Sequence, residues 1–240
     1  MVEPDGIKAL AFDVFGTVVD WRGSILRELE AFGAGRGIAA DWASFVDEWR
    51  AAYKPMMDRV RRGELPWTDL DRLHAMTLDR LLGEFGIRGD LSAADVGQLN
   101  TAWHRLAPWP DALPGLGRLK RRYVLSTLSN GNMALLVDMA KHAGLPWDCI
   151  LSAELCRHYK PDPEVYRMAS ALLGVAPHEL MLVAAHNEDL AAARAEGLRT
   201  AFVARPAEYS PCQNRDLAAE HEFDVVARDF GDLADHLGCP

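Results

Sequence analysis

Asp13 is the residue whose place in the sequence predicts chemistry most directly. It follows the strand-like run Lys8–Phe12, so its carboxylate is expected at the carboxyl end of a buried strand, where ligands of open α/β sheets bind. Enzymes that move phosphoryl groups with an aspartyl nucleophile usually carry a second Asp two residues later, which protonates the leaving alkoxide. Here that position holds Phe15. The pattern therefore favours a leaving group that departs as a stable anion, such as a halide on carbon.

Three further polar segments follow strand-like runs. They are Ser129–Asn132, Lys160–Pro163 and Ala184–Asp189. Because the carboxyl ends of parallel strands share one rim of a sheet, we expect these segments to converge on Asp13 despite their separation in sequence.

The elements that must position these residues alternate in blocks. After Asp13, roughly ninety residues show helical periodicity before strand-like runs return. Helices are predicted near Ile25–Phe32, Trp42–Arg62, Thr68–Phe85, Ser92–Leu106, Leu113–Arg121, Met133–Ala143, Pro163–Leu173, Leu190–Glu196 and Phe230–Leu237. Strands are predicted at Lys8–Phe12, Tyr123–Leu128, Cys149–Ser152, Leu180–Ala184, Arg199–Val203 and Phe223–Ala227. Thr68 and Ser92 are predicted to cap helices. This alternation favours an α/β fold with a doubly wound parallel sheet and a helical insert.

Composition limits the classes of function. The chain has 240 residues, 49% hydrophobic content and a formal charge of −9, which argues against binding of nucleic acid or an anionic membrane surface. It has no apolar run of membrane-spanning length, and its first six residues lack the features of a signal peptide, so a cytoplasmic protein is expected. The four cysteines form no metal-binding or disulfide pattern and are interpreted as reduced thiols.

The motifs resemble the haloacid dehalogenase superfamily and, within it, the type II L-2-haloacid dehalogenases. The resemblance rests on the DVFGT opening at Asp13–Thr17, the LSNG turn ending at Gly131, the YKPDPEVY segment ending at Tyr166, and a last motif ending at Asp189. Four motifs in order make a strong signal. Segments similar to the branch that includes defluorinating enzymes are Asp20–Arg22, Trp103–Arg105 and Ala185–Asn187.

The resemblance implies a Rossmann-like core domain at residues 1–19 and 109–240, with an all-helical cap domain at residues 20–108. It implies a hydrolase that acts on carbon–halide bonds and converts small 2-haloalkanoic acids into 2-hydroxy acids with inversion, through an aspartyl ester. Bromide and chloride are the expected leaving groups, and fluoride remains open. The resemblance also implies a homodimer, and the reaction asks for no metal or cofactor.

The family's catalytic roles carry over by position. Asp13 attacks the carbon that bears the halogen, and water then attacks the carbonyl of the ester. Lys160 holds Asp13 ionised by charge and hydrogen bonding, and Thr17 supports the same carboxylate. Tyr166 packs near Lys160, and Asp189 orients or deprotonates the hydrolytic water.

The binding roles carry over in the same way. Ser129, with the backbone amides of Val14 and Phe15, is expected to bind the carboxylate of the substrate. Arg50, from the helical insert, is expected to receive the departing halide together with Asn130.

The last motif departs from the family pattern. Where type II members carry Ser-Ser-Asn, this chain has Ala184-Ala185-His186. His186, with Asn187 beside it, is a candidate for the base that activates water, since a neutral imidazole accepts protons near neutral pH. The other interpretation is that His186 only orients Asp189, and the sequence does not decide between them.

Two other functions compete with this interpretation. A magnesium-dependent phosphatase of the same superfamily needs a carboxylate pair in the last motif, which Glu188 and Asp189 supply, and an acid at position 15, which is absent. A binding protein that has lost turnover is the second alternative. The retained Asp13, Thr17 and Lys160 argue against that loss.

Overall fold

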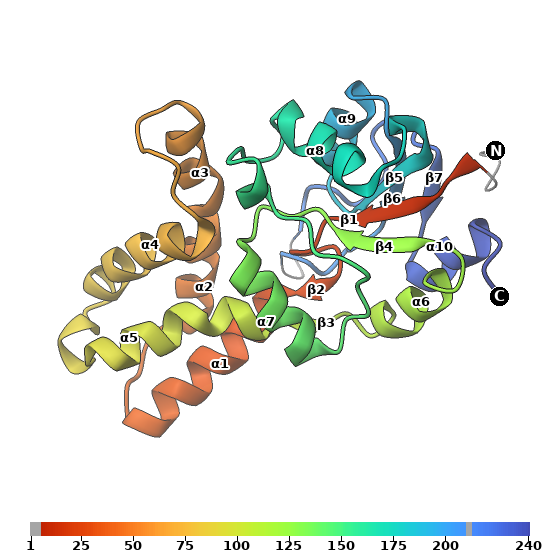
Figure 1. The fold of residues 1–240 in the computed structure, drawn as a ribbon. Helices are drawn as coiled ribbons and strands as arrows, with labels where there is room; N and C mark the ends of the chain where they lie inside the picture. The colour runs from red at the N-terminus through yellow and green to blue at the C-terminus, as the bar shows by residue number, and fades with distance from the viewer. Residues whose placement is uncertain (1–5, 210–212) are drawn as a thin grey trace.

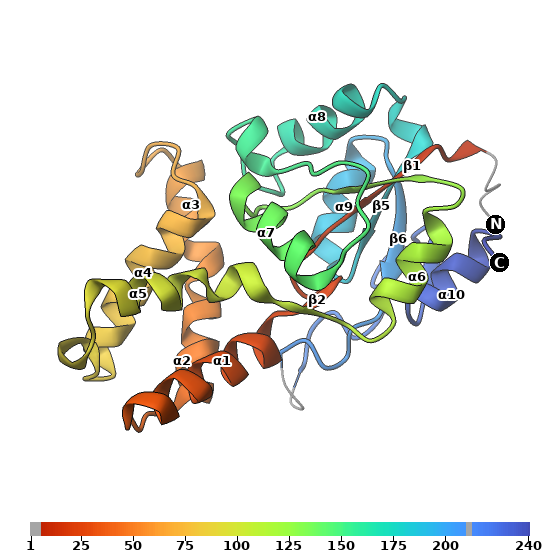
Figure 2. The same cartoon turned by 60° about the horizontal axis from the view of Figure 1, so that its bottom comes forward.

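A computed structural model describes residues 6–209 and 213–240 of the chain. Cys212 and the first five residues, which entered the predictions above, lie outside the described residues. The chain forms a parallel sheet flanked by helices, with a separate group of helices beyond one end of the sheet (Figure 1). The C-terminus and the beginning of β1 lie at the opposite end of the sheet from that group in both views (Figures 1 and 2).

The main sheet has five strands in the order β4-β1-β5-β6-β7, and all neighbours pair in parallel. The strands are β1 (Ala9–Phe12), β4 (Val124–Thr127), β5 (Leu180–Ala184), β6 (Arg199–Val203) and β7 (Val225–Ala227). Asp13 follows β1, an interior strand that lies between β4 and β5. This position places the loops of both neighbouring strands around its carboxylate.

Alternation along β1 explains why helices cover both faces of the sheet. Leu10 and Phe12 belong to one apolar cluster, whereas Ala9 and Ala11 belong to a second cluster on the other face. The first cluster packs against α6 (Ala112–Leu119), α7 (Met133–Ala143) and α10 (Phe230–His236). The second packs against α8 (Pro163–Leu173) and α9 (Asn187–Ala195). The predicted doubly wound parallel α/β fold is therefore confirmed.

The helical insert occupies the segment between β1 and α6. Its α-helices are α1 (Trp21–Arg36), α2 (Trp42–Ala51), α3 (Tyr53–Arg61), α4 (Leu70–Glu84) and α5 (Ala93–Asn100), followed by the 3₁₀ helix η3 (Thr101–Arg105). The strand arrows of the sheet point toward this insert (Figure 1). A short antiparallel pair, β2 (Val19–Asp20) with β3 (Ala107–Pro108), joins the two ends of the insert at its boundary with the core. The limits of the core domain and the cap domain given above remain a prediction.

Several predicted elements differ from the structure. The predicted strand at Cys149–Ser152 is wrong, because this segment makes only isolated bridges, at Cys149 and at Ser152. The predicted helix over Trp42–Arg62 is two helices, because α2 ends at Ala51 and α3 begins at Tyr53. In the same way, the helix predicted over Ser92–Leu106 is α5 followed by η3.

The two predicted helix caps had different outcomes. Thr68 does not cap α4, because its hydroxyl donates to the carbonyl of Pro66 and Asp69 accepts the N–H of Arg72 instead. Ser92 forms a capping box with Asp95, as predicted. No helix within residues 6–209 and 213–240 combines the length and apolar character needed to span a membrane.

Candidate active site

Asp13 is a buried carboxylate that accepts three hydrogen bonds. Its Oδ2 atom accepts from Thr17 Oγ1 at 2.7 Å and lies 3.0 Å from His186 Nδ1, while Lys160 Nζ donates to Oδ1 at 2.9 Å. Burial raises the pKa of Asp13, but the charges of Lys160 and His186 and these hydrogen bonds outweigh burial and hold it well below its usual range. Asp13 is therefore ionised and held in a single orientation.

Thr17 connects Asp13 to the neighbouring strand. Its hydroxyl donates to Asp13 and accepts the backbone N–H of Ala185, at 2.9 Å, in the loop that follows β5. One side chain thus fixes the distance between the loop that carries the carboxylate and the loop that carries His186.

Lys160 lies between two carboxylates. Its ammonium donates to Asp13 and, at 2.5 Å, to Oδ2 of Asp189, whose Oδ1 accepts from the Tyr166 hydroxyl at 2.7 Å. Burial lowers the pKa of Lys160, but the two negative charges outweigh it and raise the pKa above its ordinary value. Burial and the charge of Asp13 raise the pKa of Asp189. A carboxylate with a raised pKa is suited to accept a proton from water.

His186 bridges Asp13 and a carboxylate that the sequence did not single out, Glu208. The imidazole Nε2 lies 2.9 Å from Glu208 Oε2, while Nδ1 faces Asp13. Burial lowers the pKa of His186, but the negative charges of Glu208 and Asp13 and their hydrogen bonds outweigh it and raise the pKa well above the ordinary value. Glu208 stands alone in an irregular loop after β6, so neither periodicity nor a motif could have identified it.

Arg50 is a cation that the insert contributes to the pocket. Its guanidinium carbon lies 4.2 Å from the ring centroid of Tyr53 and 5.1 Å from that of Trp21. Its Nη2 atom is 3.9 Å from Glu208 Oε1, and its buried Nη1 atom has no hydrogen-bond partner among the described residues. Arg50 thus carries a buried donor that is free to bind an anion.

Ser129 and Asn130, the two polar residues of the LSNG turn, have different surroundings. Asn130 borders the pocket in front of Asp13, and its Oδ1 accepts the backbone N–H of Lys160 at 2.7 Å. Ser129 is fully buried, and its hydroxyl accepts the N–H of Gly131 at 3.2 Å. The backbone amides of Val14 and Phe15 have no hydrogen-bond acceptor among the described residues.

Asn187 is separated from the other predicted catalytic residues. Its side-chain amide donates to Asp216 at 2.9 Å and to the carbonyl of Ala218 at 3.1 Å, and its Oδ1 accepts the N–H of Glu220 at 2.8 Å. All these partners lie in the loop before β7. The structure therefore shows Asn187 holding this loop and not contacting Asp13.

A pocket of about 410 Å³ lies in front of Asp13, between the rim of the sheet and the insert. Its walls include Asp13, Phe15, Arg50, Tyr53, Lys160 and His186. Phe15 presents an apolar wall there and packs edge-on against Tyr53, with centroids 6.4 Å apart. A second pocket, of about 520 Å³, lies among the insert helices α2, α3 and α4. We assign the chemistry to the first pocket because it contains the buried ionised groups.

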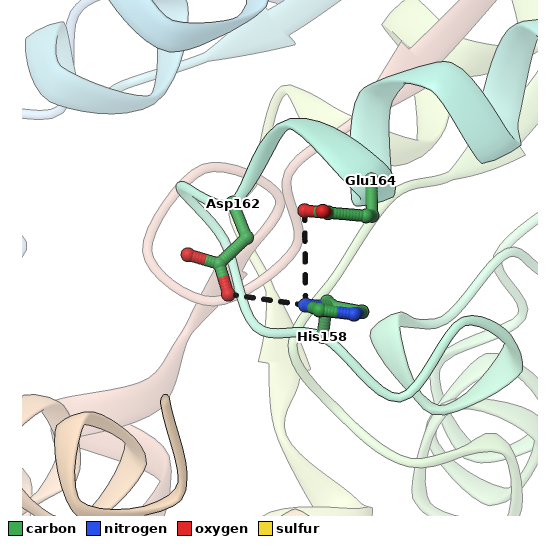
Figure 3. Close-up of side chains that lie close together, drawn as sticks. All are labelled: His158, Asp162 and Glu164. Carbon is green, nitrogen blue, oxygen red and sulfur yellow. Dashed lines mark hydrogen bonds and ion pairs between the residues drawn. The ribbon is translucent and has the colours of Figure 1, made fainter. Parts of the chain in front are cut away.

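One group of side chains in the described part of the chain has the spacing for a metal ion (Figure 3). It consists of His158, Asp162 and Glu164, at the start of α8. His158 Nδ1 lies 3.4 Å from Asp162 and 3.7 Å from Glu164, so the carboxylates already pair with the imidazole. Asp162 also pairs with Arg61 of the insert, at 2.7 Å. The geometry is that of a surface ion-pair network outside the pocket.

The phosphatase alternative needs Glu188 and Asp189 as a carboxylate pair, but the two side chains point in different directions. Glu188 points to the surface, where its carboxylate pairs with Lys54 of the insert at 2.6 Å. Asp189 faces inward and is held by Lys160 and Tyr166. The two acids therefore do not converge on Asp13 as a metal-binding pair.

Comparison with known proteins places these residues in a family context. Residues 7–197 match the model of the haloacid dehalogenase-like hydrolases. The (S)-2-haloacid dehalogenase 1 of Pseudomonas sp. (strain CBS-3) is 32% identical over 214 residues, which cover 86% of this chain and 89% of that protein.

Solved structures are similar over nearly the whole chain. The crystal structure of an L-2-haloacid dehalogenase is 52% identical with a TM-score of 0.94, covering 98% of this chain and 100% of that one. That of a defluorinating L-2-haloacid dehalogenase is 46% identical with a TM-score of 0.94, covering 97% and 95%. The Xanthobacter autotrophicus L-2-haloacid dehalogenase, with chloropropionic acid covalently bound, is 25% identical with a TM-score of 0.81, covering 97% and 98%.

Proposed function

The chain belongs to the haloacid dehalogenase-like hydrolases and, within them, to the L-2-haloacid dehalogenases, and from this premise we propose that it hydrolyses the carbon–halogen bond of small 2-haloalkanoic acids. The products are the 2-hydroxy acid, the halide and a proton. One observation carries the proposal: Asp13 is an ionised, oriented nucleophile beside Phe15, which cannot donate a proton to a leaving group. The reaction that suits this pair expels a stable anion.

In the first half-reaction, Asp13 Oδ1 attacks carbon 2 of the substrate and displaces the halide with inversion. We assign the attack to Oδ1 because it accepts one hydrogen bond, from Lys160, whereas Oδ2 is held by both Thr17 and His186. Arg50, which borders the same pocket as Asn130, receives the halide through its unpaired Nη1.

The substrate carboxylate needs its own donors. The amides of Val14 and Phe15, which have no acceptor among the described residues, suit this role at the turn that follows β1. Ser129 is fully buried, so it contributes by holding the neighbouring turn through Gly131.

In the second half-reaction, water attacks the ester carbonyl of Asp13. Asp189 takes one proton from the water, and Lys160, beside Oδ1, gives a proton to the departing 2-hydroxy acid oxygen. The direct contact between Lys160 and Asp189 then returns the proton to Lys160. The second proton of the water remains on Asp13 and passes to solvent, because the pKa of Asp13 is held low.

The test is halide release by the purified protein. We expect release from the L enantiomer of 2-chloropropionate and 2-bromopropionate, unchanged by a chelator such as EDTA. Fluoroacetate belongs in the same assay, because one similar structure is that of a defluorinating enzyme. Halide release that persists in Asp13→Asn would disprove the mechanism. A cytoplasmic location and a homodimer remain predictions, which cell fractionation and light scattering would test.

A further inference from the structure

Both nitrogens of His186 face carboxylates. Nδ1 lies 3.0 Å from Asp13 Oδ2, and Nε2 lies 2.9 Å from Glu208 Oε2. A neutral imidazole has one N–H, so it cannot donate to both carboxylates, whereas an imidazolium donates to both. The contacts of the free enzyme are therefore those of a cation. A base that must accept a proton from water needs a free nitrogen, and His186 has none in this arrangement.

Glu208 occupies a site built to hold it. The residue is 1% exposed, and its Oε1 accepts the indole N–H of Trp21 at 3.1 Å. A Cβ atom at position 16 would lie 2.1 Å from Glu208 Oε1, and Gly16 has a φ of +83°. Gly16 of the DVFGT motif thus leaves room for this carboxylate beside the nucleophile's loop. A buried carboxylate held by three elements of the fold argues for a defined task.

Glu208 matters most once the ester has formed. Alkylation removes the negative charge of Asp13, which is one of the two anions in contact with His186. Glu208 then remains as the contacting anion that favours the imidazolium. It can do so because its own pKa is lowered by His186 and Arg50, although burial acts in the opposite direction.

We propose that His186 is a cationic hydrogen-bond donor to the carbonyl oxygen of the Asp13 ester, and that Glu208 is the positioning residue that keeps His186 charged. This inference rests on the proposed function and deepens its second half-reaction. Attack through Oδ1 leaves Oδ2 as the carbonyl oxygen, where Thr17 and His186 already point their donors. As water attacks, the electron pair of the C=O bond moves onto Oδ2, and these two donors stabilise the charge that develops there.

The proton balance follows without any change on His186. Water loses its proton to Asp189, and the bond between the carbonyl carbon and Oδ1 breaks as Lys160 protonates Oδ1. His186 donates a hydrogen bond to Oδ2 throughout and transfers no proton. It is therefore a catalytic residue of the hydrolytic step but not its base.

Other charged groups border the pocket that His186 lines. Besides Asp13, they are Arg50, Lys54, Lys160, Glu188, Asp189, Arg215 and Asp216. Arg50 and Lys160 oppose a positive charge on His186, while Asp189 favours it. Glu208 is the one acid besides Asp13 that contacts the imidazole in the described part of the chain.

The two roles of His186 predict opposite pH dependences. A single turnover with L-2-chloropropionate, quenched at intervals, gives both halide release and the decay of the ester by intact-protein mass. If His186 acts as a charged donor, the decay rate of the ester has a bell-shaped pH profile. With increasing pH it first rises, as Asp189 ionises, and then falls, as His186 loses its proton. The isosteric Glu208→Gln lowers the pKa of His186 and moves the falling limb to lower pH, by roughly 1–3 units. Glu222→Gln, at an exposed position, is the matched control and leaves the profile unchanged.

The opposite outcome overturns the inference. If His186 were the base, Glu208→Gln would move the rising limb to lower pH, and decay would persist at high pH. Should Glu208→Gln not fold, 15N NMR of His186 in the unmodified protein replaces it, and a neutral imidazole at pH 7.5 overturns the inference. Failure of the proposed function is distinct, because then no halide is released in the first turnover at any pH.

Discussion

The rim of the sheet and the helical insert bring different kinds of group to the pocket. At the rim, Asp13, Lys160, His186 and Asp189 form a continuous network in which each charge contacts an opposite charge. The insert contributes Arg50. Its guanidinium packs against an aromatic ring, and one of its N–H donors has no partner among the described residues. Paired charges hold a covalent nucleophile in place, whereas an unpaired buried donor is available for a departing ion. We infer that the rim performs the bond chemistry and that the insert selects what is expelled.

The largest effect is expected from the rim's nucleophile. Asp13→Asn should lower halide release by on the order of 10⁴-fold or more, since the amide is a poor nucleophile for carbon. Halide assays under saturating substrate measure this loss. Asp90→Asn, at an exposed position of the insert, serves as the control and should retain full activity.

The second largest effect is expected from a change at the rim that slows the second half-reaction and leaves the first intact. Asp189→Asn keeps the shape of the side chain but removes the base, so ester hydrolysis should slow by about 10²–10⁴-fold. One equivalent of halide is still released in the first turnover, and the intact protein gains the mass of the bound acid. Steady turnover without an accumulated ester would assign the base to another residue.

A smaller effect is expected from the insert, in the opposite half-reaction. Arg50→Gln should slow the displacement of halide by about 10²–10³-fold, the range for loss of one donor to a developing anion. The decay rate of an ester already formed should stay unchanged. Arg80→Gln removes an exposed cation of α4 and is the control. Slower decay of the ester in Arg50→Gln would contradict the division between insert and rim.

The smallest effect concerns the contact between the two regions. His104, at the end of the insert, contacts Asp71 of α4 at 3.0 Å and Asp138 of α7 at 2.8 Å. Burial lowers the pKa of His104, but the hydrogen bonds and charges of the two acids outweigh it and raise the pKa. The stabilisation is therefore complete below the unfolded-state pKa of about 6.5 and is lost as pH rises through the higher folded-state pKa.

His104→Gln should lower the free energy of unfolding by about 1–2 kcal/mol at pH 6 and by less at pH 9. Urea unfolding at the two pH values measures the difference, with exposed His178→Gln as the control. An equal loss at both values would show that the charge of His104 contributes nothing.

The elements of the core could be predicted where side-chain periodicity reports burial directly. The predicted bounds Leu180–Ala184 and Arg199–Val203 coincide with β5 and β6, because continuous apolar runs between turn residues leave few alternatives. Cys149–Ser152 has a similar local composition but makes only isolated bridges. Whether an extended segment joins a sheet depends on the neighbour it pairs with, and a single segment does not carry that information.

The candidate site was predictable where motifs cover it. Asp13, Thr17, Lys160 and Asp189 meet in the structure because they follow parallel strands or the loops between them. Asn187 also stands in a motif, yet its side chain faces the loop before β7. Adjacent residues at the start of a helix point in different directions, so membership of a motif does not guarantee membership of the pocket.

The sequence by itself determined the doubly wound sheet, the helical insert and an aspartate at the carboxyl end of a buried strand. Local patterns of burial and turn residues carry that information. Only the tertiary structure decided that Glu208 lies beside His186 and that Asn187 binds the loop before β7 instead of facing Asp13. Both contacts join residues from irregular or distant parts of the chain. Burial leaves a charged group few partners, and the packed fold alone determines which partner is within reach.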